Sequence, residues 1–249
     1  MTNEIMNEFT KDRNNQIVDH KLVRSVCKLY VQMGMLDAEP FRSGEEFTWK
    51  GEYDLGFYKK HFQEPFLVRT RKEYDNQASS RIQALTAPDY LLWADECLER
   101  EENYCKTMLD ATTREPLMDE VEQELITKRN KMIVDKDTGL KYMVDNRLED
   151  NLRILYRCFS RREANLLCIV EEMNAYIKKE GEKIMADEEK AKDPIAFAKA
   201  LLDFKKEMDR QIAYCFNSDA KFEKGRDMSF QQFLNTSQLP SLYLAIYLN

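Results

Sequence analysis

The stretch EANLLCIVEEMNAYIKKE, residues 163–180, sets the pattern of the whole chain. Its apolar residues recur at intervals of three and four, the spacing of one stripe along a helix. The stripe consists of Leu166, Val170, Met173 and Ile177. Glu171 and Glu172 lie between the second and third of them, and Gly181 follows as a residue suited to ending a helix. The segment therefore predicts an amphipathic helix of about five turns that packs by one face.

Similar amphipathic stretches lie on both sides of this segment. Residues 19–33 predict a helix whose inner stripe is Leu22, Val26, Leu29, Tyr30 and Met33. Residues 53–85 predict a long helix that Pro65 should kink or divide, because proline lacks a backbone N–H and its ring meets the preceding turn. Thr86 is suited to cap the next helix, which continues for about six turns. Further helices are expected over residues 113–132, 151–160, 193–217 and 230–248.

The connections between these helices are short, apart from residues 38–52, which predict a loop. The chain has only 7 Gly and 6 Pro, too few for the many tight turns of an all-β fold, and no alternating strand pattern. We therefore predict an all-α fold of helical bundles or an α-solenoid. Two stacked bundles that form an elongated rod are expected, one over residues 1–134 and one over residues 135–249.

Charge and composition narrow the classes of function. The 249 residues carry a formal net charge of −7, which disfavours a nucleic-acid-binding surface. Arg69, Arg71 and Lys72 are interpreted as part of a solvated face with mixed charges. Six cysteines without a CxxC pair indicate buried thiols in a reducing compartment. Without a secretory signal or a membrane-spanning run, the sequence predicts a cytoplasmic or nuclear protein with no membrane contact.

Motifs that support catalysis or cofactor binding are weak. His20 and His61 stand outside any HExxH or HxH arrangement, so we expect no metal site. Residues 51–56 have the end spacing of a P-loop, but Phe57 and Tyr58 occupy the positions that need Lys and Ser or Thr. The adjacent acidic residues Glu171–Glu172 and Glu188–Glu189 are interpreted as solvated carboxylates. The sequence predicts no catalytic residue, no cofactor and no metal ligand.

Several short strings in the second half resemble those of the cullin family. They are Glu149-Asp150, Leu155-Tyr156-Arg157-Cys158-Phe159-Ser160-Arg161, Leu201-Leu202-Asp203-Phe204-Lys205 with Asp209, Cys215-Phe216-Asn217-Ser218-Asp219 with Phe222, and Phe230-Gln231-Gln232-Phe233-Leu234-Asn235. In the first half, His61-Phe62-Gln63-Glu64-Pro65-Phe66-Leu67 is similar to the F-x-x-P-F-L string of the family. Glu115-Pro116, Glu124-Leu125-Ile126 with Lys128, and Tyr176-Ile177 with Gly181 are similar to the cullin-three type.

Three features depart from the family pattern. Asn151 is an extra residue after the acidic pair, Ser218 replaces the usual Asn, and the loop that contains Trp49 is longer than usual. The motif residues themselves are packing and capping types. Leu155, Tyr156 and Phe159 would share one helix face, while Asn217 and Asp219 would end one helix and cap the next.

The resemblance implies a scaffold role. Cullins hold a substrate adaptor at one end of a row of helical repeats and a RING protein with its ubiquitin-charged partner at the other end. The chain is similar to the second repeat, incomplete at its start, and to the third repeat. It would be a non-catalytic spacer in an E3 ubiquitin ligase whose full assembly includes a BTB-type adaptor, a RING-box protein and an exchange factor. Two alternatives are a helical-rod subunit of a vesicle-tethering complex and a truncated cullin-like regulator.

Overall fold

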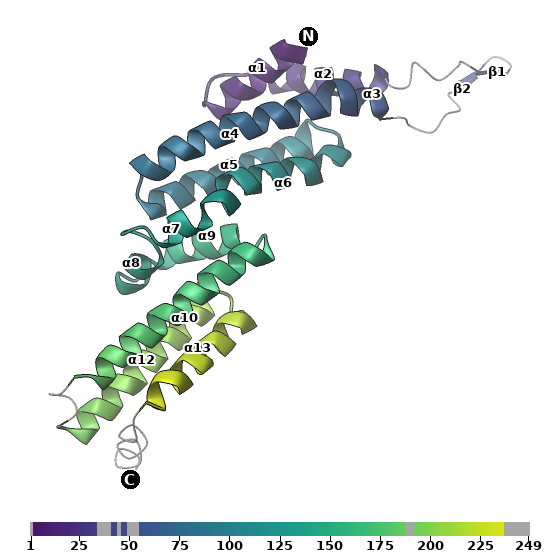
Figure 1. The fold of residues 1–249 in the computed structure, drawn as a ribbon. Helices are drawn as coiled ribbons and strands as arrows, with labels where there is room; N and C mark the ends of the chain where they lie inside the picture. Colours follow the sequence, from purple (N-terminus) through teal and green to yellow (C-terminus); the bar gives the residue numbers. More distant parts are fainter. Residues whose placement is uncertain (1, 34–40, 44–45, 49–54, 188–191, 237–249) are drawn as a thin grey trace. The chain divides into compact units, whose positions relative to one another are not determined.

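The computed structural model describes residues 2–33, 41–43, 46–48, 55–187 and 192–236. Figure 1 shows a succession of helices with one short hairpin, so the predicted all-α class is confirmed. The first helices are α1 (Thr2–Arg13), α2 (His20–Met33), α3 (Gly56–Tyr58), α4 (Glu64–Ala84), α5 (Ala87–Thr107) and α6 (Arg114–Leu125). They are followed by α7 (Asn130–Val134), α8 (Leu140–Asp145), α9 (Glu149–Phe159), α10 (Glu163–Met185), α12 (Pro194–Cys215) and α13 (Ala220–Leu234).

The chain forms two compact units. Unit 1 comprises residues 1–83 and 93–128, and unit 2 comprises residues 84–92 and 129–249. The first turns of α5 therefore belong to unit 2, where the backbone N–H of Ala87 donates to Thr138 Oγ1 at 2.8 Å. The repeat boundary after Val134 and the elongated rod remain predictions.

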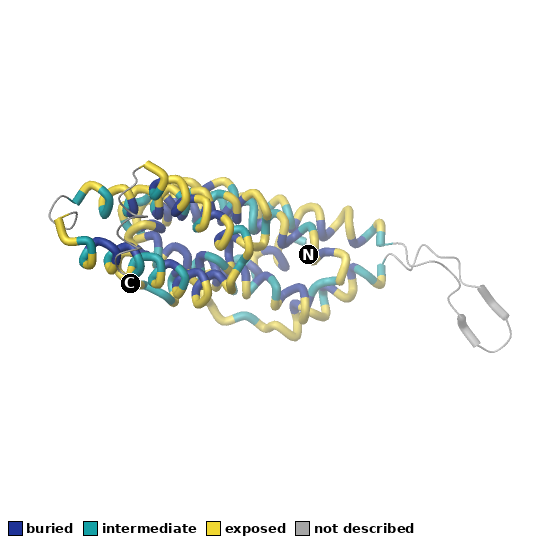
Figure 2. The backbone as a smooth tube through the Cα atoms, turned by 90° about the horizontal axis from the view of Figure 1, so that it is seen from below, coloured by how far each residue is buried: buried dark blue, intermediate teal, exposed yellow. Residues whose placement is uncertain are grey.

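Unit 1 buries the apolar stripes of its long helices. The buried residues of α5 in this unit include Ala94, Cys97, Leu98, Tyr104 and Cys105, and those of α4 include Phe66, Tyr74 and Ile82. Figure 2 shows buried and exposed positions alternating along the helical turns, as one-sided packing requires. Thr86 caps α5 as predicted, since its Oγ1 accepts from the N–H of Asp89 at 3.3 Å. An aromatic cluster holds α1 against α4 and α5; its members are Phe9, Phe62, Phe66 and Tyr104.

Pro65 marks the predicted interruption in the second long helical stretch. Residues Lys59–Gln63 form a π-helix, and α4 begins at Glu64. The wider π turn directly before the proline is consistent with the missing N–H and with the bulk of the ring against the preceding turn. The backbone therefore stays helical across Pro65, and the irregularity takes the form of a change from π-helix to α-helix.

The predicted inner stripe of α2 is wrong for two of its five members. The helix buries Val23, Cys27 and Tyr30, whereas Leu22 and Leu29 are 59% and 43% exposed. The apolar face of α2 is wider than the surface that α1 and α3 cover, so the periodicity alone could not show which edge of that face is buried. Tyr30 of the predicted stripe is buried, and Val26 and Met33 are half-buried.

A short hairpin lies within the predicted loop of residues 38–52. Strand β1 (Phe41–Ser43) pairs antiparallel with β2 (Glu46–Thr48), with Arg42 opposite Phe47. The prediction of a loop was therefore wrong for these six residues, which are too few to display an alternating pattern. Trp49 lies outside the described residues.

Unit 2 is built around α10, the helix predicted from residues 163–180. Its predicted stripe is buried as expected. The helix does not end at Gly181 but continues to Met185, and Gly181 is buried inside it. A Cβ on Gly181 would lie 2.3 Å from Cε1 of Phe233 on α13. This glycine therefore serves close packing of two helices, and its role as a helix end was predicted wrongly.

Aspartate residues cap the starts of α12 and α13, and the second of these caps was predicted. Asp193 caps α12 by accepting from the N–H groups of Ile195 and Ala196. Asp219 caps α13 by accepting from the N–H of Lys221 at 2.8 Å. The predicted helix over residues 230–248 is wrong at its start, because α13 already begins at Ala220. Residues 237–249 lie outside the described part of the chain.

The contact between α10 and α13 yields a stability prediction. We expect Gly181→Ala to destabilise unit 2 by about 1–3 kcal/mol, because the added methyl overlaps the buried ring of Phe233. Urea unfolding followed by circular dichroism measures this change. Lys178→Ala on the exposed face of α10 is the matched control, with an expected change within about 0.5 kcal/mol. Equal effects of the two substitutions would contradict the close-packing role.

Candidate functional site

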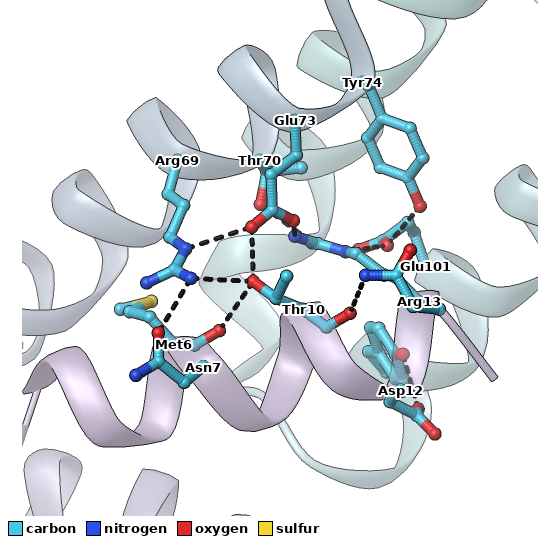
Figure 3. A network of polar contacts seen from close by, with 12 residues as sticks. Met6, Asn7, Thr10, Asp12, Arg13, Arg69, Thr70, Glu73, Tyr74 and Glu101 are labelled. Carbon is cyan, nitrogen blue, oxygen red and sulfur yellow. Dashed lines mark hydrogen bonds and ion pairs between the residues drawn. The ribbon is translucent and has the colours of Figure 1, made fainter. Parts of the chain in front are cut away.

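The most elaborate polar constellation in unit 1 surrounds Arg13, the last residue of α1 (Figure 3). Arg13 Nε donates to Glu101 Oε1 at 2.8 Å, and Nη2 donates to Glu101 Oε2 at 3.0 Å. Nη2 also donates to the hydroxyl of Thr70 at 2.8 Å. The side chain of Glu101 is fully buried, and that of Arg13 is 2% exposed. A bidentate ion pair thus crosses the interior from α1 to α5.

A second carboxylate completes the arrangement on the side of α4. Arg13 Nη1 donates to Glu73 Oε2 at 2.9 Å, and Arg69 Nε donates to Glu73 Oε1 at 3.0 Å. Thr10 on α1 donates to the same Glu73 oxygen. On the far side of the network, Arg100 Nη1 donates to the backbone carbonyl of Arg13 at 2.6 Å. Figure 3 shows these side chains converging between α1, α4 and α5.

The electrostatics of the network favour its charged form. Burial opposes the charge on Arg13, but the Glu101 carboxylate beside it leaves the pKa of Arg13 well above its ordinary value. Burial and the same carboxylate raise the pKa of Tyr74, whose hydroxyl donates to Glu101 Oε1 at 2.6 Å. Burial favours the neutral form of Glu73, but hydrogen bonding by Thr10 and the charge of Arg13 lower its pKa. These groups are held as stable ions and a neutral phenol.

This arrangement is suited to holding helices together and unsuited to acid–base chemistry. Both oxygens of Glu101 accept hydrogen bonds from Arg13, one of them also from Tyr74, and the carboxylate has no exposed surface. A general acid or base must reach a substrate proton, and Glu101 is enclosed by its own partners. We therefore interpret the Arg13 network as a structural lock between α1, α4 and α5.

Sequence reasoning did not single out Arg13 or Glu101, although a signal was present. Arg13 follows Ile5, Met6 and Phe9 on the buried side of α1. Glu101 stands four residues after Cys97 on the buried stripe of α5. A single charge of opposite sign within each of two apolar stripes is the pattern that predicts a buried ion pair.

The histidines that the sequence analysis considered lie apart. His20 Nε2 is 3.0 Å from Asp12 Oδ1 at the exposed start of α2. The ring of His61 packs against Phe57, with ring centroids 4.5 Å apart. Within the described residues, no three His, Cys, Asp or Glu side chains gather as metal ligands would. In the same part of the chain, none of the helices combines the length and apolar character of a membrane span.

The basic and acidic groups named from the sequence are mostly engaged. Arg69 pairs with Glu73 and the exposed Arg71 with Glu120, and Lys72 is exposed, as a solvated face with mixed charges predicts. Glu172 Oε2 is 3.6 Å from Lys131 Nζ. Glu188 and Glu189, like residues 51–54 of the P-loop-like segment, lie outside the described residues.

None of the six cysteines forms a disulfide, and four have strongly shifted thiols. Burial raises the pKa of Cys27, Cys97 and Cys105 to about 12 and that of Cys215 to about 11. A thiol with so high a pKa stays protonated at neutral pH, and the thiolate is the nucleophilic form. These cysteines therefore act as small apolar residues, as the sequence analysis expected.

Two of the family-like strings of the second half, those around Tyr156 and Phe216, contact each other in unit 2. Leu155 and Phe159 are fully buried on one face of α9, which also carries Tyr156. The Tyr156 hydroxyl donates to Asp219 Oδ2 at 3.0 Å, and the rings of Phe216 and Phe222 stack at 4.3 Å. The predicted packing and capping roles are confirmed.

Two of the departures also lie in unit 2. Asn151 lies inside α9, which runs without interruption from Glu149 to Phe159. Asn217 and Ser218 both have φ of 51° in the tight connection before α13. Asn adopts this left-handed conformation more readily than Ser does, so Ser218 occupies a position better suited to the usual Asn.

Comparison with known proteins agrees with the arrangement. The family model described as the cullin alpha solenoid domain matches residues 1–249. Cullin-3 of Dictyostelium discoideum is 24% identical over 100% of this chain and 30% of its own length. Cullin-3A of Arabidopsis thaliana is 24% identical over 100% of the chain and 31% of its own length. Cullin-4A of Homo sapiens is 30% identical over 90% of the chain and 26% of its own length. The chain thus spans about three tenths of these relatives.

The buried ion pair predicts an asymmetric response to substitution. Arg13→Leu should destabilise unit 1 by about 3–5 kcal/mol, because it leaves the Glu101 carboxylate buried without its partner. The double substitution Arg13→Leu with Glu101→Leu should recover much of that loss. Urea unfolding measures both. Arg71→Leu, which breaks the exposed pair with Glu120, is the control and should change stability by less than about 1 kcal/mol. Equal losses in the single and double variants would refute the lock.

The lowered pKa of Glu73 predicts a pH dependence. A carboxyl group whose pKa is lower in the folded protein than in the unfolded chain stabilises the fold above its ordinary value of 4.5. That stabilisation is lost as pH falls through the lowered native pKa. Glu73→Gln should therefore be less stable than the parent at pH 7, and the difference should shrink from about pH 5 to pH 3. Unfolding curves at several pH values test this, with Glu96→Gln on the exposed face of α5 as the control.

Proposed function

This chain belongs to the cullin family, and on that premise we propose that it acts as a rigid, non-catalytic scaffold segment of a cullin-RING E3 ubiquitin ligase. Its task is to fix the spacing between a substrate adaptor and the RING module that brings the ubiquitin donor. Spacing matters chemically because a reacting group held in a fixed position has a far higher effective concentration than one that moves freely. The observation that carries the proposal is the Arg13 network, in which buried charged side chains hold helices together.

Within each unit, the interior supports stiffness. In unit 1, one guanidinium ties three helices, because Arg13 on α1 contacts Glu73 on α4 and Glu101 on α5. In unit 2, close contact at Gly181 holds α10 against α13. Such contacts allow few alternative packings, since interiors at this density do not deform continuously. A spacer requires this property, whereas an active-site cleft would require an accessible titratable group.

The partners follow from the family proposal. In the complete scaffold they would be a BTB-type substrate adaptor, a RING-box protein and an exchange factor, with no nucleic acid or membrane. We propose the cytoplasm, the nucleus or both as the compartment, which the six free cysteines support. Family membership favours this role over that of a vesicle-tethering rod.

A chimaera tests the spacer function. We would exchange the segment of Dictyostelium discoideum Cullin-3 that matches this chain for residues 1–249 and measure substrate ubiquitination with adaptor, RING-box protein and E2. We expect transfer by the chimaera and severalfold slower transfer after Arg13→Leu, because a loosened unit 1 positions substrate less well. Lys178→Ala should leave the rate unchanged.

Binding measurements separate spacing from assembly. Adaptor and RING-box capture should be equal in all chimaeras, so that a rate change reports geometry. A folded chimaera that captures both partners but transfers no ubiquitin would contradict the proposal. The size of the endogenous protein on an immunoblot distinguishes the truncated regulator, since a band near 29.6 kDa would favour that alternative.

A further inference from the structure

Unit 1 carries a basic pocket that the spacer function does not use. The pocket has a volume of about 350 Å³ and lies between α2 and the end of α5 with the turn that follows. Its charged rim contains Arg24 and Lys28 on α2 and Lys106 on α5. Its apolar lining includes Cys27 and Met108, both buried. This volume falls within the range of sites that hold a peptide side chain or a small ligand.

The cations of this pocket are available to a ligand. Within the described part of the chain, Arg24 and Lys28 are exposed and form no hydrogen bond or ion pair. Lys106 Nζ lies 3.9 Å from Glu102 Oε1, an oxygen that already accepts from Arg114 Nε at 2.9 Å. The pocket is therefore rich in unneutralised positive charge.

The lining holds one acidic residue, Asp110, which offsets part of the charge of its three cations. Asp110 Oδ1 accepts from the backbone N–H of Thr112 at 3.0 Å and from its hydroxyl at 2.7 Å. That carboxylate is occupied as the N-cap of the short 3-10 turn Ala111–Thr113. The lining thus has three cationic side chains and one carboxylate, although the net charge of the chain is −7.

The interior wall of the pocket selects among anions. Cys27 is 1% exposed and protonated at neutral pH, since burial raises its pKa to about 12. It therefore adds no negative charge to the wall, whose apolar surface comes from half-buried Val31 and Leu109 beside Met108. Inorganic phosphate could contact the cations but would leave this surface uncovered. A peptide that combines carboxylates with an apolar side chain would use both parts of the pocket.

We propose that this pocket binds an acidic peptide segment of a partner protein, with carboxylates on Arg24 and Lys28 and an apolar side chain against Met108. The site goes beyond the spacer function and holds whether or not the chain spaces the two ends of a ligase. Nucleic acid fits less well, because a phosphate backbone needs an extended row of cations and the chain as a whole is acidic.

Fluorescence polarisation with the whole chain tests the site. The probe is a fluorescein-labelled peptide of sequence Glu-Glu-Leu-Phe-Glu-Glu, and the control peptide has Gln at each Glu position. We expect saturable binding of the acidic peptide that weakens as salt is raised. The double variant Arg24→Glu with Lys28→Glu should bind about tenfold more weakly or worse, because each reversal replaces an attraction with a repulsion.

Matched variants keep the test specific. Lys60→Glu with Lys72→Glu makes the same change of charge at two exposed lysines of unit 1 outside the pocket and should alter binding less than twofold. Ala111→Trp should weaken binding by filling the pocket without changing charge. Equal weakening by both double variants, equal binding of the Gln peptide, or displacement by inorganic phosphate at a lower concentration than by unlabelled peptide would each overturn the proposal.

Discussion

Arg13 carries a full positive charge into the interior of unit 1, and the surrounding helices are arranged to satisfy it. A buried guanidinium without partners would be very unfavourable, so α4 and α5 must present Glu73 and Glu101 at hydrogen-bonding distance from α1. The geometry of the planar guanidinium leaves little freedom in how the three helices slide past one another. Apolar stripes bring these helices together, and the ion pairs select one register among the packings that the stripes alone would allow.

Unit 2 reaches a defined packing by a different route. Its central pair of helices, α10 and α13, approach closely where Gly181 meets Phe233 and where Gly225 meets Asn174. At its turns, Asp193 and Asp219 satisfy the first backbone N–H groups of α12 and α13. The strings that resemble the cullin family fall largely on these packing and capping positions. The residues that mark the family are thus largely the residues that specify the fold.

The buried polar groups around Arg13 hold helices together, whereas Arg24 and Lys28 are exposed and unpaired among the described residues. The carboxylates and phenols around Arg13 form hydrogen bonds within one network, and the thiols with raised pKa are protonated. By contrast, the cations between α2 and the end of α5 border an open pocket. A scaffold needs both kinds of region, one to hold its own helices and one to contact other proteins.

The sequence by itself determined the helical class, the long helices and several caps. Periodicity and cap chemistry are local properties, and Leu166 to Ile177, Thr86 and Asp219 show them directly. Only the tertiary structure decided which edge of α2 is buried, why Gly181 lies within a helix and that Arg13 pairs with Glu101. These features depend on what lies opposite each residue. Arg13 and Glu101 are 88 positions apart in the chain, and local spacing carries no information about which helix will face which.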